Sequence, residues 1–342
     1  MALISITGAS LLSACSDTDT NETPRPSDGV EATGAPENSE LGPVPDAEVL
    51  LATLEQTREV LGACSAVATT SSRRLTRICG VIQEQHEVLV RLIDAGGLET
   101  GNAATSTSEA SDRAEETSSE EAASTGDDSE AQASAAAKAK TEAEAEAETT
   151  VATVLAAQST GDEIAATLVT VSPTNLPTLM ALHGQRAAAA ETLGAPVKWP
   201  DVEGPLEAGA ITVLAGLRQA VYGFEVLVAR STEKEREVYN EALIPLREAS
   251  RIVTELAGPA APVAPLGYGL PSGVATKEER RQLAKDLLAA LPQAVIAGSA
   301  ARAGDEDAIT GTLRLLSLSV RLGTSFRVPM DPFPGLTVPA SP

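Results

Sequence analysis

Aromatic residues are scarce in this chain of 342 residues, at 2% of the sequence. All seven of them (one Trp, three Tyr and three Phe) lie after residue 198, so the first half must pack with aliphatic side chains. Small, unbranched side chains suit closely spaced helices, because Ala loses no side-chain entropy in a helix. Runs of aromatic and β-branched residues with period two, which predict strands, are missing. The composition therefore predicts an all-α fold.

Basic residues are outnumbered, with 25 Lys and Arg against 48 Asp and Glu, for a net charge of −23. Residues 17–48 carry a net charge of −8 and residues 99–148 carry −11, which leaves −4 for everything else. The acidity thus belongs to a tail and a linker. A nucleic-acid partner is disfavoured, because binding phosphates requires a basic stripe.

Histidine is rarer still, with His86 and His183 alone in the sequence. A di-iron carboxylate site needs two Glu-x-x-His motifs, but the residues three positions earlier are Gln83 and Met180. The sequence also lacks a Gly-x-Ser-x-Gly nucleophile elbow and a Gly-rich phosphate loop. We therefore predict no enzymatic activity, no metal site and no cofactor.

The N-terminus predicts export, although its apolar run, residues 1–14, contains no Lys or Arg. This run is too short to span a bilayer. The tetrapeptide that ends in Cys15, LSAC, resembles the bacterial lipobox. That resemblance implies a signal peptide over 1–14 and acyl chains, palmitate among them, on the Cys15 sulfur. A free hydrophobic N-terminus with an incidental Cys is the alternative.

Residues 15–45 are polar, acidic and Pro-rich, and they predict a disordered tether. Several acyl chains on Cys15 would be needed for stable attachment to the membrane. The expected location is the outer face of the cytoplasmic membrane, with the folded part held off the surface.

The remaining cysteines, Cys64 and Cys79, are separated by 14 residues that include a predicted bend. A disulfide between them suits an oxidising compartment and would contribute about 3 kcal/mol. A metal pair or a nucleophile is the alternative, although neither a second Cys pair nor a matching His accompanies them.

Hydrophobic periodicity predicts two helical hairpins in the first half. The first, 46–97, has Asp46 as an N-cap and a second helix from Ser72 to Ala95. An acidic insert over 98–140 is expected to be disordered, with its last residues as an alternative, solvated extension of the next helix. The second hairpin, 141–196, is expected to contain one helix that continues to about residue 171 and another over 175–193.

The second half, 204–336, predicts four helices with one long Pro/Gly crossover after Gly258, an arrangement found in ferritin-like bundles. Helix starts are indicated by a Pro at 205, by an N-cap at Asp305, and by two capping boxes, Thr232 with Glu235 and Thr276 with Glu279. Pro292 is expected to kink or interrupt its helix.

Four segments of this half resemble the ferritin-like domain of actinobacterial secreted proteins of unknown function: AGLRQAVYGFEVL (215–227), APVAPLGYGLPSGVA (261–275), QLAKDLLAALPQAV (282–295) and FPGL (333–336). LHGQRAAAAETLG (182–194) is similar to the helical region before that domain in related lipoproteins. The resemblance implies a degenerate ferritin-like bundle preceded by a second helical region. The Glu-His pair of the family is absent before Val221-Tyr222, so no activity that depends on it is expected.

Three residues are candidates for a polar core. His86 and His183 fall on the apolar sides of their helices, and Tyr222 lies near the middle of its helix. We expect hydrogen-bonded histidines, with a ligand role or a pH switch as the alternative, and a buried Tyr222 with a bonded hydroxyl. The candidate partners of the histidines are Glu55, Glu59 and Gln85.

Two charged groups are expected on helix surfaces. The cluster KEERR (277–281) predicts a solvated first turn, with the binding of an acidic partner by Arg280 and Arg281 as the alternative. A second group is spaced for ion pairs across helix turns. Its members are Arg247, Glu248, Arg251 and Glu255.

These observations favour a non-catalytic lipoprotein of the cell envelope, a helical binding or scaffold module for an envelope protein or a membrane complex. One alternative is a carrier of a small apolar ligand in the bundle core, between the crossover and the first and last helices of the bundle. A degenerate ferritin-like enzyme is the other.

Overall fold

The computed structural model describes residues 45–67, 72–98, 128–159, 161–200 and 207–337. In these ranges the chain forms nine α-helices and two short 3-10 turns, and no strand is present, which confirms the all-α prediction. The signal peptide, Cys15 and nearly all of the tether lie outside the described residues. In chain order the elements are α1 (Ala47–Ala66), α2 (Arg73–Ala95), α3 (Asp128–Ala157), α4 (Gly161–Leu168), α5 (Leu176–Thr192), α6 (Glu207–Arg230), α7 (Glu233–Ala257), η1 (Gly258–Ala260), α8 (Lys277–Ile296), η2 (Ser299–Arg302) and α9 (Glu306–Ser325).

Helices α1 and α2 form the predicted hairpin, joined by a disulfide between Cys64 and Cys79 whose Cα atoms lie 5.9 Å apart. The Ser72 hydroxyl accepts a hydrogen bond from the Leu75 amide at 3.2 Å, as an N-cap does. Gly97, with a φ of 71°, follows the end of α2. The disulfide prediction and the bounds of α2 are therefore confirmed.

Asp46 does not cap its own helix, contrary to the prediction. Its backbone is left-handed (φ 65°), and its carboxylate accepts hydrogen bonds from the Ser172 amide, the Ser172 hydroxyl and the Asn175 side chain. Burial alone would raise the pKa of Asp46, but these hydrogen bonds lower it. Asp46 therefore ties the start of α1 to the turn that precedes α5.

Helix α3 differs from the expected boundaries at both ends. It begins at Asp128, inside the insert that was expected to extend to residue 140, and residues 134–143 are exposed, as a solvated extension would be. It ends at Ala157, so the single helix expected to reach residue 171 is wrong. The Gly161 amide donates to the Lys198 carbonyl oxygen, and a Cβ at Gly161 would lie 3.0 Å from Trp199. The start of α4 therefore lies directly against the segment that contains Lys198 and Trp199.

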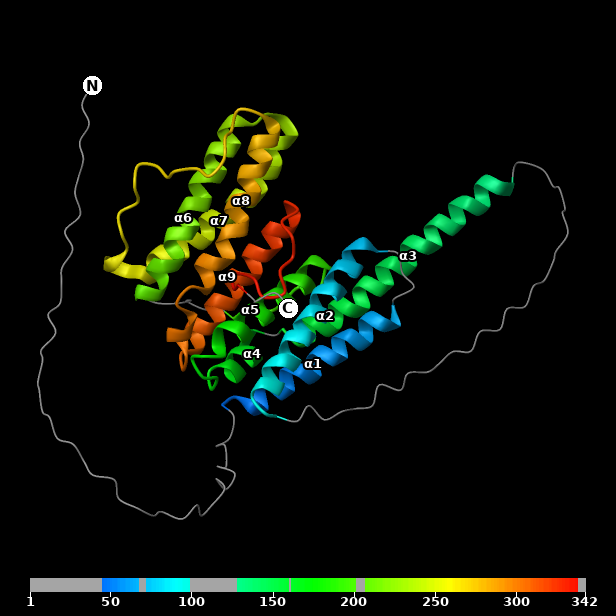
Figure 1. Ribbon diagram of the computed structural model, residues 1–342. Coiled ribbons are helices and arrows are strands. Elements are labelled where there is room, and N and C mark those ends of the chain that lie inside the picture. Colours follow the sequence, from blue (N-terminus) through cyan, green and yellow to red (C-terminus); the bar gives the residue numbers. More distant parts are fainter. Residues whose placement is uncertain (1–44, 68–71, 99–127, 160, 201–206, 338–342) are drawn as a thin grey trace, which may run out of the picture. The chain divides into compact units, whose positions relative to one another are not determined.

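Helices α6 to α9 follow, with α6 packed against both α7 and α8 (Figure 1). Asp305 caps α9, and Thr276 and Glu279 form the predicted capping box of α8. The box predicted for Thr232 is absent, because the Glu235 carboxylate instead binds Arg280 of α8. Helix α8 continues through Pro292 to Ile296, so this proline does not end the helix.

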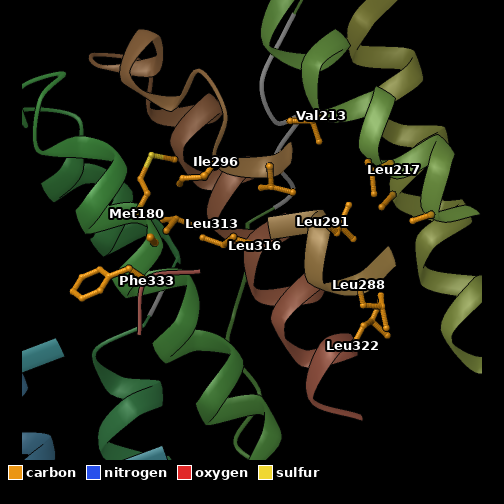
Figure 2. Packing of buried hydrophobic residues seen from close by; sticks show 14 of the residues in the cluster. Met180, Val213, Leu217, Leu288, Leu291, Ile296, Leu313, Leu316, Leu322 and Phe333 are labelled. Carbon is orange, nitrogen blue, oxygen red and sulfur yellow. The ribbon is translucent and has the colours of Figure 1, made fainter. Parts of the chain in front are cut away.

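The two halves share the larger of two hydrophobic clusters, which combines residues of α1, α2, α4 and α5 with residues of α6 to α9. A second, smaller cluster is formed by residues of α1, α2, α3, α5 and the segment that follows α5. Figure 2 shows Met180 of α5 beside Leu313 and Leu316 of α9. Helix α5 packs against α3 and α9, and 13 of its 17 residues are buried. The C-terminal tail turns back onto the helices, and Phe333 is fully buried.

Helix α6 also has the length and composition of a membrane span. Its segment Gly209–Arg230 has a mean hydropathy of 1.4, and it is the one such segment in the described part of the chain. In the structure, Val213, Leu217 and Phe224 of this segment are buried against the neighbouring helices. Packing inside the bundle is enough to explain its apolar composition.

Candidate functional site

The two histidines do not meet, and neither bonds to Glu55, Glu59 or Gln85 among the described residues. His86 is half-exposed, and burial with the nearby Arg58 lowers its pKa. His183 is buried, and its Nδ1 has no partner in the described part of the chain. Burial, with Arg186 nearby, lowers the pKa of His183 to about 3, so its imidazole is neutral at physiological pH. The expectation of hydrogen-bonded core histidines is therefore wrong.

The polar core is built from residues that no sequence pattern indicated as a group. The side chain of Gln85 in α2 donates to Gln185 of α5 at 3.0 Å and to the Pro332 carbonyl oxygen at 2.8 Å. The Arg186 guanidinium donates to Gln85 Oε1 at 3.2 Å and to the Thr57 hydroxyl. This network joins α1, α2, α5 and the C-terminal tail.

Arg186 is fully buried without an ion pair to any described carboxylate. Burial lowers its pKa to about 9, so the guanidinium stays charged at neutral pH. An unpaired buried charge is costly, and such groups often mark functional sites. The pockets described below are lined by other residues, however, and we assign Arg186 a structural role.

Tyr222 is half-buried, so its expected place in the core is wrong. Its ring lies 5.6 Å from that of Tyr268 in the crossover, and a Cβ at Gly267 would lie 3.2 Å from its hydroxyl oxygen. Tyr222 therefore holds the crossover against α6. A larger residue at position 267 would therefore require the Tyr222 side chain to shift slightly.

An apolar groove runs between α7 and α9, which are not a closely packed helix pair, although both α6–α7 and α8–α9 are. Its volume is about 310 Å³. Small-molecule sites in proteins begin at about this size and are mostly apolar with a few polar groups. The lining residues are Glu191, Trp199, Pro245, Glu248, Ala249, Ile252, Val253, Leu256, Gly311, Arg314, Leu315, Leu318 and Arg321.

Glu191 fixes one wall of this groove. Its carboxylate accepts a hydrogen bond from Trp199 Nε1 at 3.2 Å and forms an ion pair with Arg321 at 3.2 Å. The Ser317 hydroxyl also donates to it, at 3.4 Å. These contacts tie Trp199 to α9 through the Glu191 carboxylate, so the groove has a preformed side.

A second pocket, of about 500 Å³, lies where the N-terminal ends of α7 and α8 meet the C-terminal end of α9. An ion pair at 2.7 Å joins Glu235 of α7 to Arg280 of α8 beside it, and Arg280 lowers the pKa of Glu235. The expectation that the first turn of α8 is only solvated is therefore wrong for Arg280. The lining residues are Lys234, Glu235, Val238, Tyr239, Lys277, Arg281, Lys285, Ser325, Phe326 and Arg327.

The predicted ion pairs on α7 are confirmed in part. Arg251 binds Glu248 at 2.7 Å and Glu255 within the same helix. Arg247 instead reaches Glu225 of α6, at 2.7 Å. Exposed pairs of this kind contribute less than about 1 kcal/mol each.

No three His, Cys, Asp or Glu side chains lie close enough to hold a metal ion in the part of the chain that the structure describes. No family model matches the sequence, and no curated protein or solved structure is significantly similar to it. The ferritin-like resemblance of 204–336 thus stays a prediction.

Proposed function

We propose that this chain is a lipid-anchored, non-catalytic binding protein of the cell envelope, and that the groove between α7 and α9 holds a small apolar molecule or acyl chain. The groove is the observation that carries this proposal. It combines apolar walls, a ligand-sized volume and a side fixed by Glu191.

The groove is a better place for a ligand than the space between α6 and α8 inside the bundle. Between α6 and α8 the helices lie in close contact, because a Cβ at Gly216 would lie 2.4 Å from Ala294 and one at Gly223 would lie 2.2 Å from Leu287. Leu217 and Phe224 fill the space beside them. A carrier function would therefore use the surface groove.

The extracytoplasmic location rests on two features. The Cys64–Cys79 disulfide is typical of an oxidising compartment. The lipobox-like sequence before Cys15 and the acidic tether after it would place the helical body outside the cytoplasmic membrane. In this proposal 204–336 is a degenerate ferritin-like bundle without the catalytic groups of such folds.

A scaffold function toward an envelope protein is the second candidate. Val263 and Leu266 of the crossover are almost completely exposed, at 94% and 108% of their reference areas. Apolar side chains on such a Pro-rich segment could contact a partner. A stoichiometric protein that co-purifies from detergent-solubilised membranes would favour this candidate over the carrier.

Native mass spectrometry of the protein extracted from its own membranes tests the carrier function. We expect a bound apolar molecule that is lost in the variant Leu318→Glu, because the substitution places a charge in the groove. Leu266→Glu is the matched control, since Leu266 is exposed outside the groove and should leave the ligand bound. An empty wild-type protein, or equal retention by both variants, would refute the groove as the ligand site.

The anchor is tested separately by Cys15→Ser, which removes the proposed acylation site. We expect the protein to appear in the medium, because the acyl chains are its only proposed attachment to the membrane. Unchanged membrane retention of this variant in cell fractionation would contradict the lipid anchor while leaving the groove unaffected.

A further inference from the structure

We propose that the pocket between the N-terminal ends of α7 and α8 binds the phosphate group of a phosphate ester, either a lipid headgroup or a soluble molecule. This site is separate from the groove between α7 and α9 and goes beyond the proposed carrier function. We call it the basic pocket and define it by its cationic residues Lys234, Lys277, Arg281, Lys285 and Arg327.

The basic pocket is rich in positive charge, although the chain as a whole is strongly acidic. The sequence has a net charge of −23, yet five cations from three separate segments line one pocket of about 500 Å³. Its acidic lining residue, Glu235, is already bound to Arg280 at 2.7 Å. Like charges held together destabilise a fold, so the cluster is better explained by an anion that neutralises it.

Most of these cations lack a carboxylate partner. Arg281 forms a long ion pair with Glu278, at 3.7 Å, between two exposed side chains. Lys234, Lys277, Lys285 and Arg327 form no ion pair with any described residue. Their ammonium and guanidinium groups are therefore available to a ligand.

The helix geometry adds to this charge. Lys234 and Lys277 lie in the first turns of α7 and α8, so the positive ends of two helix dipoles meet at the pocket. The Thr276 hydroxyl caps α8, but the Thr232 side chain forms no cap hydrogen bond with α7. The first amide groups of α7 thus have no side-chain acceptor, and a phosphate oxygen would suit them.

The floor of the pocket is apolar. The rings of Tyr239 and Phe326 stack at 5.9 Å with an angle of 10° between their planes, and Val238 is 49% exposed beside them. The Tyr239 hydroxyl donates to Glu235 at 3.2 Å, so the ring is held in place. Tyr239 itself is only 2% exposed, so the apolar part of a ligand would meet Val238 and the partly exposed Phe326.

Phosphate is favoured over carboxylate as the head group because several cations line the same pocket. A phosphate offers more negative charge and more acceptor oxygens than a carboxylate, and Lys and Arg both bind it well. The source of the phosphate can be a lipid headgroup or a soluble phosphate ester, and the experiment has an arm for each.

The experiment uses the full chain with Cys15→Ser and two probes, glycerol 3-phosphate in titration calorimetry and phosphatidylglycerol vesicles in sedimentation. Glycerol and phosphatidylcholine vesicles are the uncharged and net-neutral references. We expect saturable binding that weakens as salt is raised. The double variant Lys277→Glu/Lys285→Glu should weaken it by about tenfold or more, because two charge-assisted contacts are reversed.

The matched control is Lys138→Glu/Lys140→Glu on the exposed part of α3, which changes the net charge equally and should bind as before. Arg327→Gln, at an exposed position, removes one pocket cation without reversing it and should weaken binding less than the double variant. Thermal unfolding verifies that each variant is folded.

Binding of the vesicles through Lys277 and Lys285 would identify a lipid headgroup as the source. Binding of glycerol 3-phosphate alone through the same residues would identify a soluble ester. No saturable binding of either probe, or equal loss in both double variants, would overturn the proposal. None of these results depends on whether the groove between α7 and α9 holds a ligand.

Discussion

His183 is buried inside α5 with 5% of its surface exposed, and its imidazole stays neutral in the native state. Burial lowers its native pKa to about 3, whereas an unfolded histidine has a pKa of about 6.5. Between these values the unfolded chain binds a proton that the native protein does not. The contribution of His183 to stability is therefore fully present above pH 6.5 and is lost as the pH falls.

We expect the free energy of unfolding to fall by about 2 kcal/mol between pH 6.5 and pH 5 through this residue alone, since each pH unit contributes about 1.4 kcal/mol. Urea denaturation at both pH values should show a smaller fall for His183→Gln. His86→Gln is the control, because His86 is half-exposed and should leave most of the pH dependence intact. Equal slopes for His183→Gln and the wild type would contradict the assignment.

The orientation and the partners of the Arg186 side chain could not be predicted from the sequence. It stands beside the alanine run 187–190 on a helix that is buried on nearly all sides, so periodicity does not tell where it points. Its partners, Gln85 and Thr57, come from two other helices about a hundred residues away. His86 was predicted for the polar core because imidazole is a versatile hydrogen-bonding group. The residue of α2 that binds Arg186 is instead Gln85, one position earlier.

Helix α6 and helix α8 approach each other through glycine. A Cβ at Gly216 would lie 2.4 Å from the Cβ of Ala294, whereas one at Gly80 of α2 would have nothing within 4 Å. Alanine improves helix propensity at both positions by about 1 kcal/mol, but overpacking costs about 1 to 3 kcal/mol. The sign of the change in stability should therefore differ between the two sites.

We expect Gly80→Ala to raise the free energy of unfolding by up to about 1 kcal/mol. Gly216→Ala should lower it by about 1 to 2 kcal/mol, because the clash exceeds the gain in propensity. Urea denaturation of the two variants beside the wild type measures both changes. A stabilising Gly216→Ala would show that α6 and α8 can move apart at no cost.

Helix starts were predictable where a cap acts within its own helix. Ser72, Asp305 and the Thr276–Glu279 box all bond to amides a few residues away. The caps predicted for Asp46 and Glu235 do not form, because each carboxylate instead bonds to residues of another segment. A local sequence pattern does not show whether a distant segment will compete for a capping side chain. It also does not show which distant segments come together, so the basic pocket, whose cations come from three separate segments, was not predicted.

Two hydrophobic clusters form the interior of the described body, and the larger one is shared by both halves of the chain. The sole tryptophan, Trp199, packs against both clusters, and the smaller one contains Cys64 of the disulfide. The sequence predicted two helical regions but could not tell whether they would fuse. The reason is that α5 contacts α9 through small residues, Gly184 against Leu316 among them, which give no periodic signal.

We therefore expect Trp199 fluorescence and far-ultraviolet circular dichroism to report one unfolding transition with the same midpoint. Cys64→Ala/Cys79→Ala should lower the free energy of unfolding by about 3 kcal/mol and shift both signals together. Cys15→Ser, which leaves the disulfide intact, should shift neither. Two separated transitions in the wild type would contradict a shared core.

The contacts of the C-terminal tail with the first hairpin determine when the native interior can be completed during synthesis. Phe333 fills part of the interior, and the Pro332 carbonyl oxygen accepts the hydrogen bond from Gln85 of the first hairpin. A ribosome releases these residues long after α1 and α2. The Gln85 side chain of the first hairpin therefore cannot make this contact until the C-terminal tail has been synthesised, so the native interior is completed only after translation ends.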